Sequence, residues 1–358
     1  MNNLFFELLQ VTLGTREKLS RMPNAQEWER LYEEAENQAI VGILLTGLER
    51  LPSEQLPPLE VKLQWIGEVQ IIQHENKVKD SAVVDLCEWF LGEDIRFVVV
   101  KGQTLAAIYP DNSLRQSGDI DFLVHPDDWS KAFALVERTG LNIESEHAEK
   151  HVEWTKEEVP YEMHHALACF ARPRHQRYWE NVIEPEIWKH PWTVEIEGYL
   201  VPTLFPVLNV LYVFVHIFEH FIKEGIGLRQ IVDWFYLMEN VRWKKEDVEQ
   251  LDRWLNGIGL KKAFVGFGAV LTDYLGLSDE AFPFEISSVY HQKAPVLMKN
   301  ILEMGNFGHN KGTLQGLKHI GRIWSQTWKF GNLAPAEVWW RIPHMFGWWG
   351  KKTWMMMK

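Results

Sequence analysis

The sequence predicts an α+β fold in which a small mixed sheet lies between an N-terminal and a C-terminal helical region. Up to about residue 91, and again from about residue 205, apolar residues recur every three or four positions, as on one face of a helix. Between these regions the chain carries short apolar runs rich in β-branched residues and bounded by Gly, Pro and Asp, which are typical of strands. We therefore divide the chain into a helical region at 1–91, an α/β core at 92–203 and a helical region at 204–358.

The N-terminal region is expected to hold several helices. Leu4, Leu8 and Leu9 share one helical face, and so do the apolar residues of the segment 41–48. The proline-rich stretch LPSEQLPPLE at 51–60 indicates a turn. A long helix is predicted to follow this turn, at about 59–91.

The core region is expected to alternate between strands and helices. The run IRFVVVKG predicts a buried strand, which a short helix at 104–109 follows, and DIDFLV at 119–124 predicts a second strand. The segment HPDDWSKAFALVERTG at 125–140 predicts a helix that starts at its Pro-Asp pair and ends at its last glycine. Two further strands are predicted at 151–155 and 159–164.

The C-terminal region opens with two predicted helices within 206–241, separated by a glycine turn at 225–227. Polar residues interrupt the longest apolar run, at 204–221, so no membrane span is expected. The first ten residues lack the basic and apolar segments of a signal peptide. A cytoplasmic location is the expectation that follows.

The distribution of charge distinguishes the body of the chain from its end. The net charge of −12 argues against a general nucleic-acid-binding protein, because phosphate backbones are bound by clustered Lys and Arg. Residues 311–358, however, hold eight Lys and Arg against one acid, Glu337, and seven of the 18 tryptophans. We expect this basic tail to dock on the acidic body, with contact to an anionic membrane surface or a partner as the alternative. The two cysteines, Cys87 and Cys169, are both expected to be buried.

Two carboxylates in the second predicted strand point to a metal site. Asp119 and Asp121 share one face of the strand, whereas Ile120, Phe122 and Val124 face a core. Two like charges side by side repel each other, so a compensating charge is expected. We favour a divalent metal ion over a solvated strand edge. From the repulsion, we expect Asp121→Asn to leave the metal-free fold equally or slightly more stable.

The whole segment FVVVKGQTLAAIYPDNSLRQSGDIDFLVHPDDW resembles the polymerase-β-like nucleotidyltransferase superfamily. Within it, the segment is similar to a bacterial group often labelled uncharacterised nucleotidyltransferase, which reads K-G, Y-P, an Arg, D-I-D-x-L-V and a Pro-Asp helix start. The resemblance covers about 95–165 and continues weakly through GLRQIVDW at 227–234.

The resemblance implies a reaction and a set of metal ligands. Such enzymes move a nucleoside monophosphate from a nucleoside triphosphate, most simply ATP, to an acceptor, with Mg²⁺ or Mn²⁺ as cofactor. It implies that Asp119 and Asp121 hold metal and that a third acid on a neighbouring strand completes the set. Glu162, in VPYEMHH, is the candidate. The acceptor is not identified by the sequence, although the acidic body makes RNA the least suitable one.

Four further residues are candidates for binding the nucleotide. Gly102 follows a strand and precedes a helix, so its turn offers backbone N–H groups to an anion. Many relatives have Gly-Ser there, whereas this chain has Gly-Gln with Thr104 next, which leaves the replacement for the hydroxyl open. Lys101 is expected to neutralise a phosphate or to cap the strand end. Arg115 is expected to bind triphosphate or to pair with Asp111 or Asp127.

The remaining candidates would line the cleft. His164 shares a strand face with Glu162, so it is favoured over His165. Arg229 and Asp233 stand at i and i+4 of a predicted helix, where they would form a helix-surface ion pair or line the site.

One competing motif needs consideration. HIFEH, which contains His216 and His220, fits the H-x-x-E-H signature of inverted-motif zinc proteases. The sequence has no motif that identifies a third zinc ligand, so we interpret the two histidines as core or cleft-lining residues. A second alternative to the enzyme is a non-catalytic nucleotide-binding or regulatory protein on the same fold.

Overall fold

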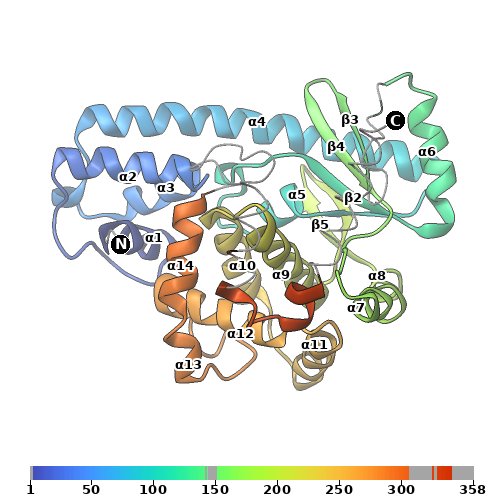
Figure 1. Cartoon of the computed structure of the whole chain (residues 1–358). Helices are drawn as coiled ribbons and strands as arrows, with labels where there is room; N and C mark the ends of the chain where they lie inside the picture. The colour runs from blue at the N-terminus through green and yellow to red at the C-terminus, as the bar shows by residue number, and fades with distance from the viewer. Residues whose placement is uncertain (1–2, 142, 144–150, 306–324, 326–328, 341–358) are drawn as a thin grey trace, which may run out of the picture.

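The computed structural model describes the chain except for residues 1–2, 142, 144–150, 306–324, 326–328 and 341–358. It confirms the mixed α+β class: a four-stranded mixed sheet is formed by the middle of the chain, and helices precede and follow it in the sequence. Figure 1 shows the helices of both terminal regions beside each other, with the sheet at one end of the molecule.

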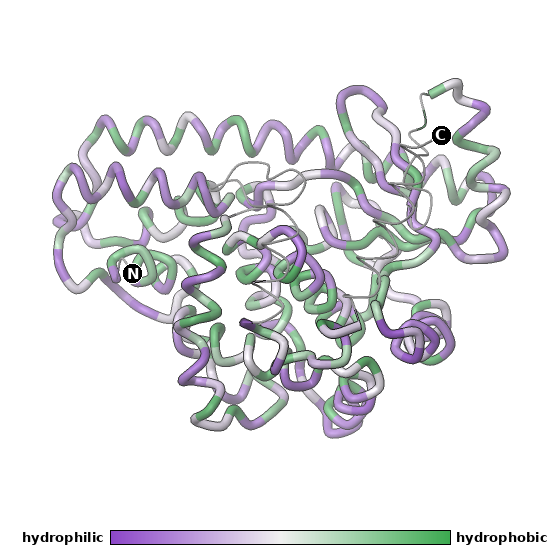
Figure 2. Tube along the Cα trace, in the orientation of Figure 1, coloured by the Kyte–Doolittle hydropathy of each residue, from purple (hydrophilic) through white to green (hydrophobic). Residues whose placement is uncertain are grey.

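The N-terminal region forms the helices that periodicity predicted. These are α1 Asn3–Leu13, α2 Ala25–Asn37, α3 Val41–Arg50 and α4 Leu59–Gly92, with a 3-10 turn at Ser53–Gln55. A capping box starts α2: the Asn24 side chain accepts from the Glu27 N–H, and the Glu27 carboxylate accepts from the Asn24 N–H. Helix α4 spans the length of the molecule and connects the helices to the sheet, with polar and apolar residues alternating along it (Figures 1 and 2).

The sheet has the strand order β1-β2-β4-β3. Its strands are β1 Phe97–Val100, β2 Ile120–Val124, β3 His151–Lys156 and β4 Val159–His164. The pairs β1/β2 and β3/β4 are antiparallel, and the central pair β2/β4 is parallel. Short elements lie between the strands: α5 Gly102–Ala106, 3-10 turns at Asn112–Leu114 and Pro126–Asp128, and α6 Trp129–Glu137.

A β-hairpin that we did not predict follows the sheet. It consists of β5 Trp192–Ile196 and β6 Tyr199–Thr203, after α7 Pro173–Tyr178, a π-helical turn Trp179–Ile183 and α8 Glu186–Lys189. The hairpin turn has positive φ at both Glu197 (49°) and Gly198 (76°), as a two-residue type I′ turn requires. The Thr203 hydroxyl donates to the Val99 carbonyl at 2.7 Å, which attaches the hairpin to β1.

The C-terminal region is helical, as predicted. Its described elements are α9 Pro206–Lys223, α10 Leu228–Asn240, α11 Lys245–Gly257, α12 Lys261–Val270, a π-helical turn Leu271–Leu275, α13 Ser288–His291 and α14 Ala294–Met304. By length and composition alone α9 could cross a membrane, but 78% of it is buried inside the protein. Its apolar side chains are therefore accounted for by packing in the core.

Two buried apolar clusters hold these elements together. The larger cluster joins the two helical regions; for example, the Phe6 and Tyr274 rings lie 4.9 Å apart, and the Thr15 hydroxyl donates to the Leu275 carbonyl at 2.7 Å. The smaller cluster lies between α4, α6 and one face of the sheet. Phe90 and Phe122 meet edge to face within it, with ring centroids 5.2 Å apart.

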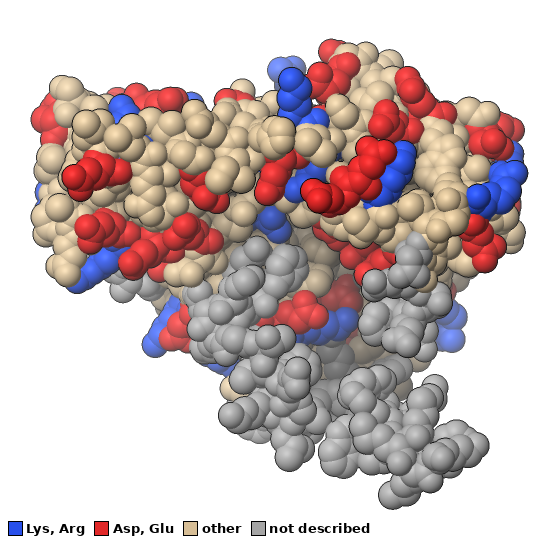
Figure 3. Space-filling view, turned by 90° about the horizontal axis from the view of Figure 1, so that it is seen from above, with Lys and Arg blue, Asp and Glu red and all other residues tan. Residues whose placement is uncertain are grey.

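Residues 329–340 of the basic tail dock on the body of the protein. Phe330, Leu333 and Val338 are buried there. The buried Glu337 carboxylate accepts from the Ala171 N–H at 2.8 Å, and its other oxygen lies 2.5 Å from His175 Nδ1. Apart from Ser325, the rest of the tail lies outside the described residues. Acidic side chains dominate the charged groups on the upper face of the body (Figure 3).

The cysteines differ from one another. Cys87 is buried beneath the sheet, as expected, whereas Cys169 is exposed, so the expectation for the second cysteine is wrong. Cys169 lies in the apolar run ALACFA at 166–171, in the irregular connection after β4, where Leu167 and Ala168 are buried and Cys169 faces outward.

Candidate active site

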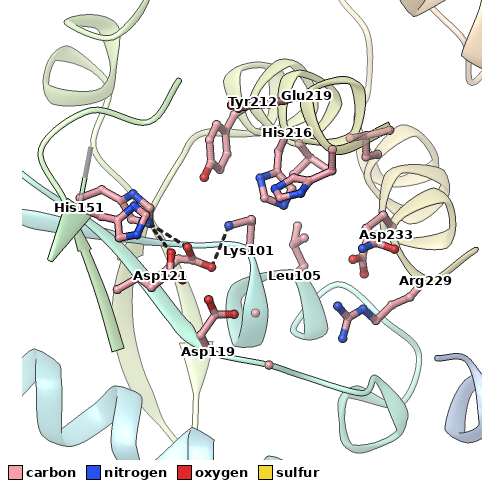
Figure 4. A pocket seen from close by; sticks show the side chains of 18 of the residues that line it. Lys101, Leu105, Asp119, Asp121, His151, Tyr212, His216, Glu219, Arg229 and Asp233 are labelled. Atoms are coloured by element: carbon pink, nitrogen blue, oxygen red, sulfur yellow. Dashed lines mark hydrogen bonds and ion pairs between the residues drawn. The ribbon is translucent and has the colours of Figure 1, made fainter. Parts of the chain in front are cut away.

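A cavity of about 320 Å³ lies between one face of the sheet and helices α9 and α10. Figure 4 shows the residues of β2, the β1–α5 turn and the two helices around it. All of the predicted site residues except Thr104 line it. These are Lys101, Gly102, Arg115, Asp119, Asp121, Glu162, His164, His216, His220, Arg229 and Asp233.

Three carboxylates converge at the sheet side of the cavity. The parallel register of β2 and β4 places Asp121 directly opposite Glu162, and Asp119 immediately precedes β2. Each residue offers a carboxylate oxygen within 4.8 Å of the other two. The neighbours Tyr161 and Met163 are buried on the opposite face, so the period-two prediction for this strand is confirmed.

The electrostatic states of the two aspartates differ strongly. Repulsion by Asp121, together with burial, raises the pKa of Asp119 to about 7. Burial would also raise the pKa of Asp121, but the Lys101 ammonium and the His164 imidazole outweigh it and hold this pKa below its usual value. The compensating charge that the sequence required is therefore present for Asp121, within the chain itself.

His164 faces the carboxylates, as its alternation with Glu162 predicted. Its Nε2 lies 2.8 Å from Asp121 Oδ1 and 3.4 Å from Glu162 Oε2. Burial would lower the pKa of His164, but hydrogen bonds to these two carboxylates raise it overall. His165 is exposed and its ring packs against Trp129, away from the site.

His151 is a cavity residue that we did not identify from the sequence. It lies opposite His164 in the antiparallel pair β3/β4, and its Nε2 is 2.5 Å from Glu153 Oε1. His151, His164 and Glu162 also offer ligand atoms within 4.8 Å of one another. The alternation in HVEWTK places His151 and Glu153 on one strand face, and that signal would have identified both residues had the pairing of β3 with β4 been known.

Of the three residues predicted for the phosphate-binding turn, Lys101 and Gly102 line the cavity and Thr104 does not. Lys101 Nζ lies 2.9 Å from Asp121 Oδ2, and Gly102 lines the cavity with φ of 41°. Thr104 is 1% exposed, and its hydroxyl donates to the Lys101 carbonyl at 2.7 Å. The structure therefore does not bring Thr104 to the cavity, because its hydroxyl stabilises the first turn of α5.

Arg115 pairs with a residue that the sequence did not suggest. Its Nε and Nη2 donate to the two Asp233 oxygens at 2.6 and 2.8 Å, and the Tyr109 hydroxyl donates to Asp233 Oδ1 at 2.6 Å. Arg115 and Asp233 are 4% and 2% exposed. The expected partners Asp111 and Asp127 are thus wrong, because folding brings α10 against the loop before β2.

Arg229 is not the partner of Asp233 either, although the two residues are one helical turn apart. Its Nη1 donates to the Gln116 carbonyl at 2.9 Å, and its buried Nε has no hydrogen-bond partner. Within the described part of the chain, no carboxylate forms an ion pair with Arg229. The hypothesis of a helix-surface ion pair is therefore wrong, and Arg229 lines the cavity instead.

The HIFEH motif forms part of the opposite wall of the cavity. Glu219 Oε1 lies 2.6 Å from Lys223 Nζ, and His220 Nδ1 lies 3.0 Å from Glu224 Oε2. Among the described residues, the groups able to share a metal ion lie on the sheet side of the cavity and do not include His216 or His220. This arrangement supports our interpretation of the two histidines as cleft-lining residues.

Comparison with known proteins identifies the family of this chain. A family model described as "Uncharacterised nucleotidyltransferase" matches residues 24–276. The chain belongs to this nucleotidyltransferase family. The match extends well beyond the segment that carried the resemblance, since it includes α2 to α4 and most of the C-terminal helices.

Two other comparisons add no functional detail about this nucleotidyltransferase family member. Among solved structures, it is similar to an antigenic nucleotidyltransferase-like protein from Paracoccidioides brasiliensis, with 13% identity over 56% of this chain and 92% of that chain. The TM-score of 0.36 is too low for an argument from that likeness. No curated protein matches the chain.

The site of this family member fits a divalent cation. Carboxylate oxygens are the ligands that Mg²⁺ and Mn²⁺ prefer. The raised pKa of Asp119 reports negative charge that its surroundings do not neutralise. A divalent ion bound by Asp119, Asp121 and Glu162 would remove that repulsion.

The metal-free protein is expected to lose stability as pH rises from about 4 to about 7. The pKa of Asp119 is about 7 in the folded state and 3.8 in the reference state, so the folded protein binds more protons in this window. Stability then falls with rising pH. Thermal unfolding in the presence of a chelator, compared between wild type and Asp119→Asn, measures the effect. The variant should show a smaller decline, and equal declines in both proteins would contradict the assignment.

Proposed function

We propose that this protein is a metal-dependent nucleotidyltransferase that transfers a nucleoside monophosphate from a nucleoside triphosphate, most simply ATP, to an acceptor. The observation that carries the proposal is the convergence of Asp119, Asp121 and Glu162 on one cavity, which Arg229 lines on the far side (Figure 4). Family membership supports the reaction class. The cytoplasm, where ATP and Mg²⁺ are abundant, is the location that we propose.

The three carboxylates would hold Mg²⁺ or Mn²⁺. The ion would supply positive charge beside the reacting phosphate and its leaving group. The chain itself orients the ligands: Asp121 and Glu162 stand on two hydrogen-bonded strands whose register sets their spacing, and Asp119 immediately precedes the first of these strands. His164 holds one oxygen of Asp121 through Nε2, so that the carboxylate keeps one orientation.

Arg229 is the residue that we propose for triphosphate binding, in place of Arg115. Both residues line the cavity, but the Arg115 guanidinium is paired with both oxygens of Asp233, whereas Arg229 has no carboxylate partner in the described part of the chain. Burial and the charge of Arg115 lower the pKa of Arg229, which an entering phosphate would reverse. The backbone of the Gly102 turn is a second proposed phosphate contact.

The acceptor is proposed to enter along α9. His216 and His220 line that wall, with ring centroids 4.3 Å apart, and His216 lies across the cavity from the aspartates (Figure 4). Polar side chains on this wall suit an acceptor that presents a hydroxyl or an amine. A non-catalytic nucleotide-binding protein would use the same carboxylates and Arg229, so activity must be measured directly.

The proposal is tested with purified protein and each of the four α-labelled ribonucleoside triphosphates, with Mg²⁺ or Mn²⁺ and a small-molecule extract as the acceptor source. Transfer of label together with release of pyrophosphate is expected, and chelation of the metal should stop both. Triphosphate binding without pyrophosphate release under all of these conditions would favour the non-catalytic alternative.

Glu162→Gln is expected to lower metal-dependent turnover by more than about 100-fold while weakening triphosphate binding only modestly. The loss of one ligand removes several kcal/mol of charge stabilisation from the transition state, whereas Asp119 and Asp121 still retain the ion. Turnover and calorimetric binding of Mg-ATP are the measurements. Glu195→Gln, on the exposed strand β5, is the matched control and should be silent. A silent Glu162→Gln would remove Glu162 from the metal site.

A further inference from the structure

Lys101 has a backbone conformation that is unusual for a residue with a side chain. Its φ is 57° and its ψ −145°, directly before the positive-φ residue Gly102. Glycine is the residue that adopts such values without strain. Strained backbone persists where the surrounding structure requires it, and it is found most often at functional sites.

The side chain that this conformation presents is directed at the carboxylate cluster (Figure 4). Lys101 Nζ lies 2.9 Å from Asp121 Oδ2, and His164 Nε2 lies 2.8 Å from the other oxygen, Oδ1. Their side chains are 15%, 3% and 5% exposed for Lys101, Asp121 and His164. Both oxygens of Asp121 are thus engaged, whereas Asp119 and Glu162 have no Lys or Arg partner among the residues that the structure describes.

The balance of charge is consistent with one further cation. Leaving aside the imidazole of His164, three carboxylates and one ammonium carry two net negative charges, which one divalent ion neutralises. A second divalent ion held by the protein would produce an excess of positive charge within a few ångströms of the buried ammonium. That repulsion is strong in a site from which water is largely excluded.

We propose that the Lys101 ammonium is a built-in cation that takes the place of one of the two divalent ions used by many phosphoryl-transfer sites. The protein then holds a single divalent ion, bound by Asp119, Glu162 and the remaining lone pairs of Asp121. The proposal deepens the function proposed above and rests on it for the reaction, but not for the binding of metal.

Lys101 keeps its charge under working conditions. Its Nζ lies 2.9 Å from Asp121 Oδ2, and a carboxylate at this distance favours the charged ammonium. An ammonium that served only to bind phosphate would have to leave Asp121 when the nucleotide entered. The contact with Asp121 and the strained backbone both favour a cation that remains in place.

The test is titration of the full chain with Mn²⁺ alone, followed by calorimetry and by electron paramagnetic resonance. Wild type should bind one Mn²⁺ at the cluster, and Lys101→Met should bind two, with spin–spin broadening from their proximity. Lys101→Arg, which keeps the charge, should bind one. Lys223→Met is the matched control, because Lys223 lines the same cavity but pairs with Glu219, and it should also bind one.

Two Mn²⁺ at the cluster of wild type would overturn the proposal, and so would a single ion in folded Lys101→Met. If Lys101→Met does not fold, Lys101→Gln replaces it, with the same two outcomes. Failure of nucleotidyl transfer with these stoichiometries intact would reject the proposed function and leave the built-in cation standing.

Discussion

Asp121→Asn is expected to abolish Mg²⁺-dependent triphosphate binding and to lower turnover by several orders of magnitude. Asp121 is central in the carboxylate cluster, because it lies opposite Glu162 in the sheet and binds both Lys101 and His164. Its replacement removes a metal ligand and leaves the ammonium without its counter-charge. The loss of charge stabilisation at the reacting phosphate should exceed that of any other single ligand.

The effect of this substitution on stability differs from the expectation based on charge repulsion alone. From the sequence we expected that removing the charge of Asp121 would relieve its repulsion with Asp119 and leave the metal-free protein equally or slightly more stable. Because Lys101 and His164 stabilise the charge of Asp121, the variant should be less stable by roughly 1–3 kcal/mol, although the amide oxygen still accepts a hydrogen bond. Relief of repulsion is instead expected for Asp119, because its raised pKa shows that its negative charge is unfavourable in the folded protein. Asp119→Asn should therefore be at least as stable as wild type.

Calorimetric titration with Mg-ATP measures the loss of binding, and urea unfolding confirms that Asp121→Asn remains folded. Asp127→Asn is a suitable control, because Asp127 is exposed and pairs with Arg96 on the surface. Unchanged binding of Mg-ATP by folded Asp121→Asn would remove Asp121 from the metal site.

Asp233→Ala is expected to destabilise the fold by roughly 3–5 kcal/mol. The substitution leaves the Arg115 guanidinium charged and buried without a counter-ion, and it removes the acceptor of the Tyr109 hydroxyl. The ion pair joins α10 to the loop before β2, so its loss should also weaken the docking of the C-terminal helices beside the cavity. Such a cost is a large fraction of the stability of an ordinary domain.

The free energy of unfolding in urea is the measurement. Replacing both partners, as in Arg115→Met with Asp233→Leu, should recover part of the loss, because no buried charge remains unpaired. Glu249→Ala is the control, since its pair with Lys245 is solvent-exposed and contributes less than about 1 kcal/mol. A cost below 1 kcal/mol for Asp233→Ala would show that Arg115 is solvated or paired by another route.

Much of the fold and of the carboxylate site followed from local patterns. The proline-rich turn before it and the strand-like run after it located α4 to within one residue, and alternation by two assigned Asp121, Glu162 and His164 to the cavity face of their strands. Side-chain direction along a strand or helix is a property of the backbone, so it can be inferred without knowledge of the neighbours. The motif around Asp119 also pointed correctly to the nucleotidyltransferase family.

The prediction failed where the outcome depended on contacts between distant segments. Arg115 and Asp233 are 118 positions apart, and nothing local to either residue identifies the other. The β5–β6 hairpin was missed because its strands are short and half exposed, although the two-residue turn between them was a usable signal.

By itself, the sequence determined the fold class, the order of the main elements, the family and the face on which each metal-site acid stands. Only the tertiary structure decided which cations meet which carboxylates: Lys101 with Asp121, Arg115 with Asp233, and Arg229 left to the cavity. The physical reason is that the direction of a side chain is set by its own backbone. Its partner is set by the register of β2 with β4 and by the packing of α9 and α10, which are properties of the whole chain.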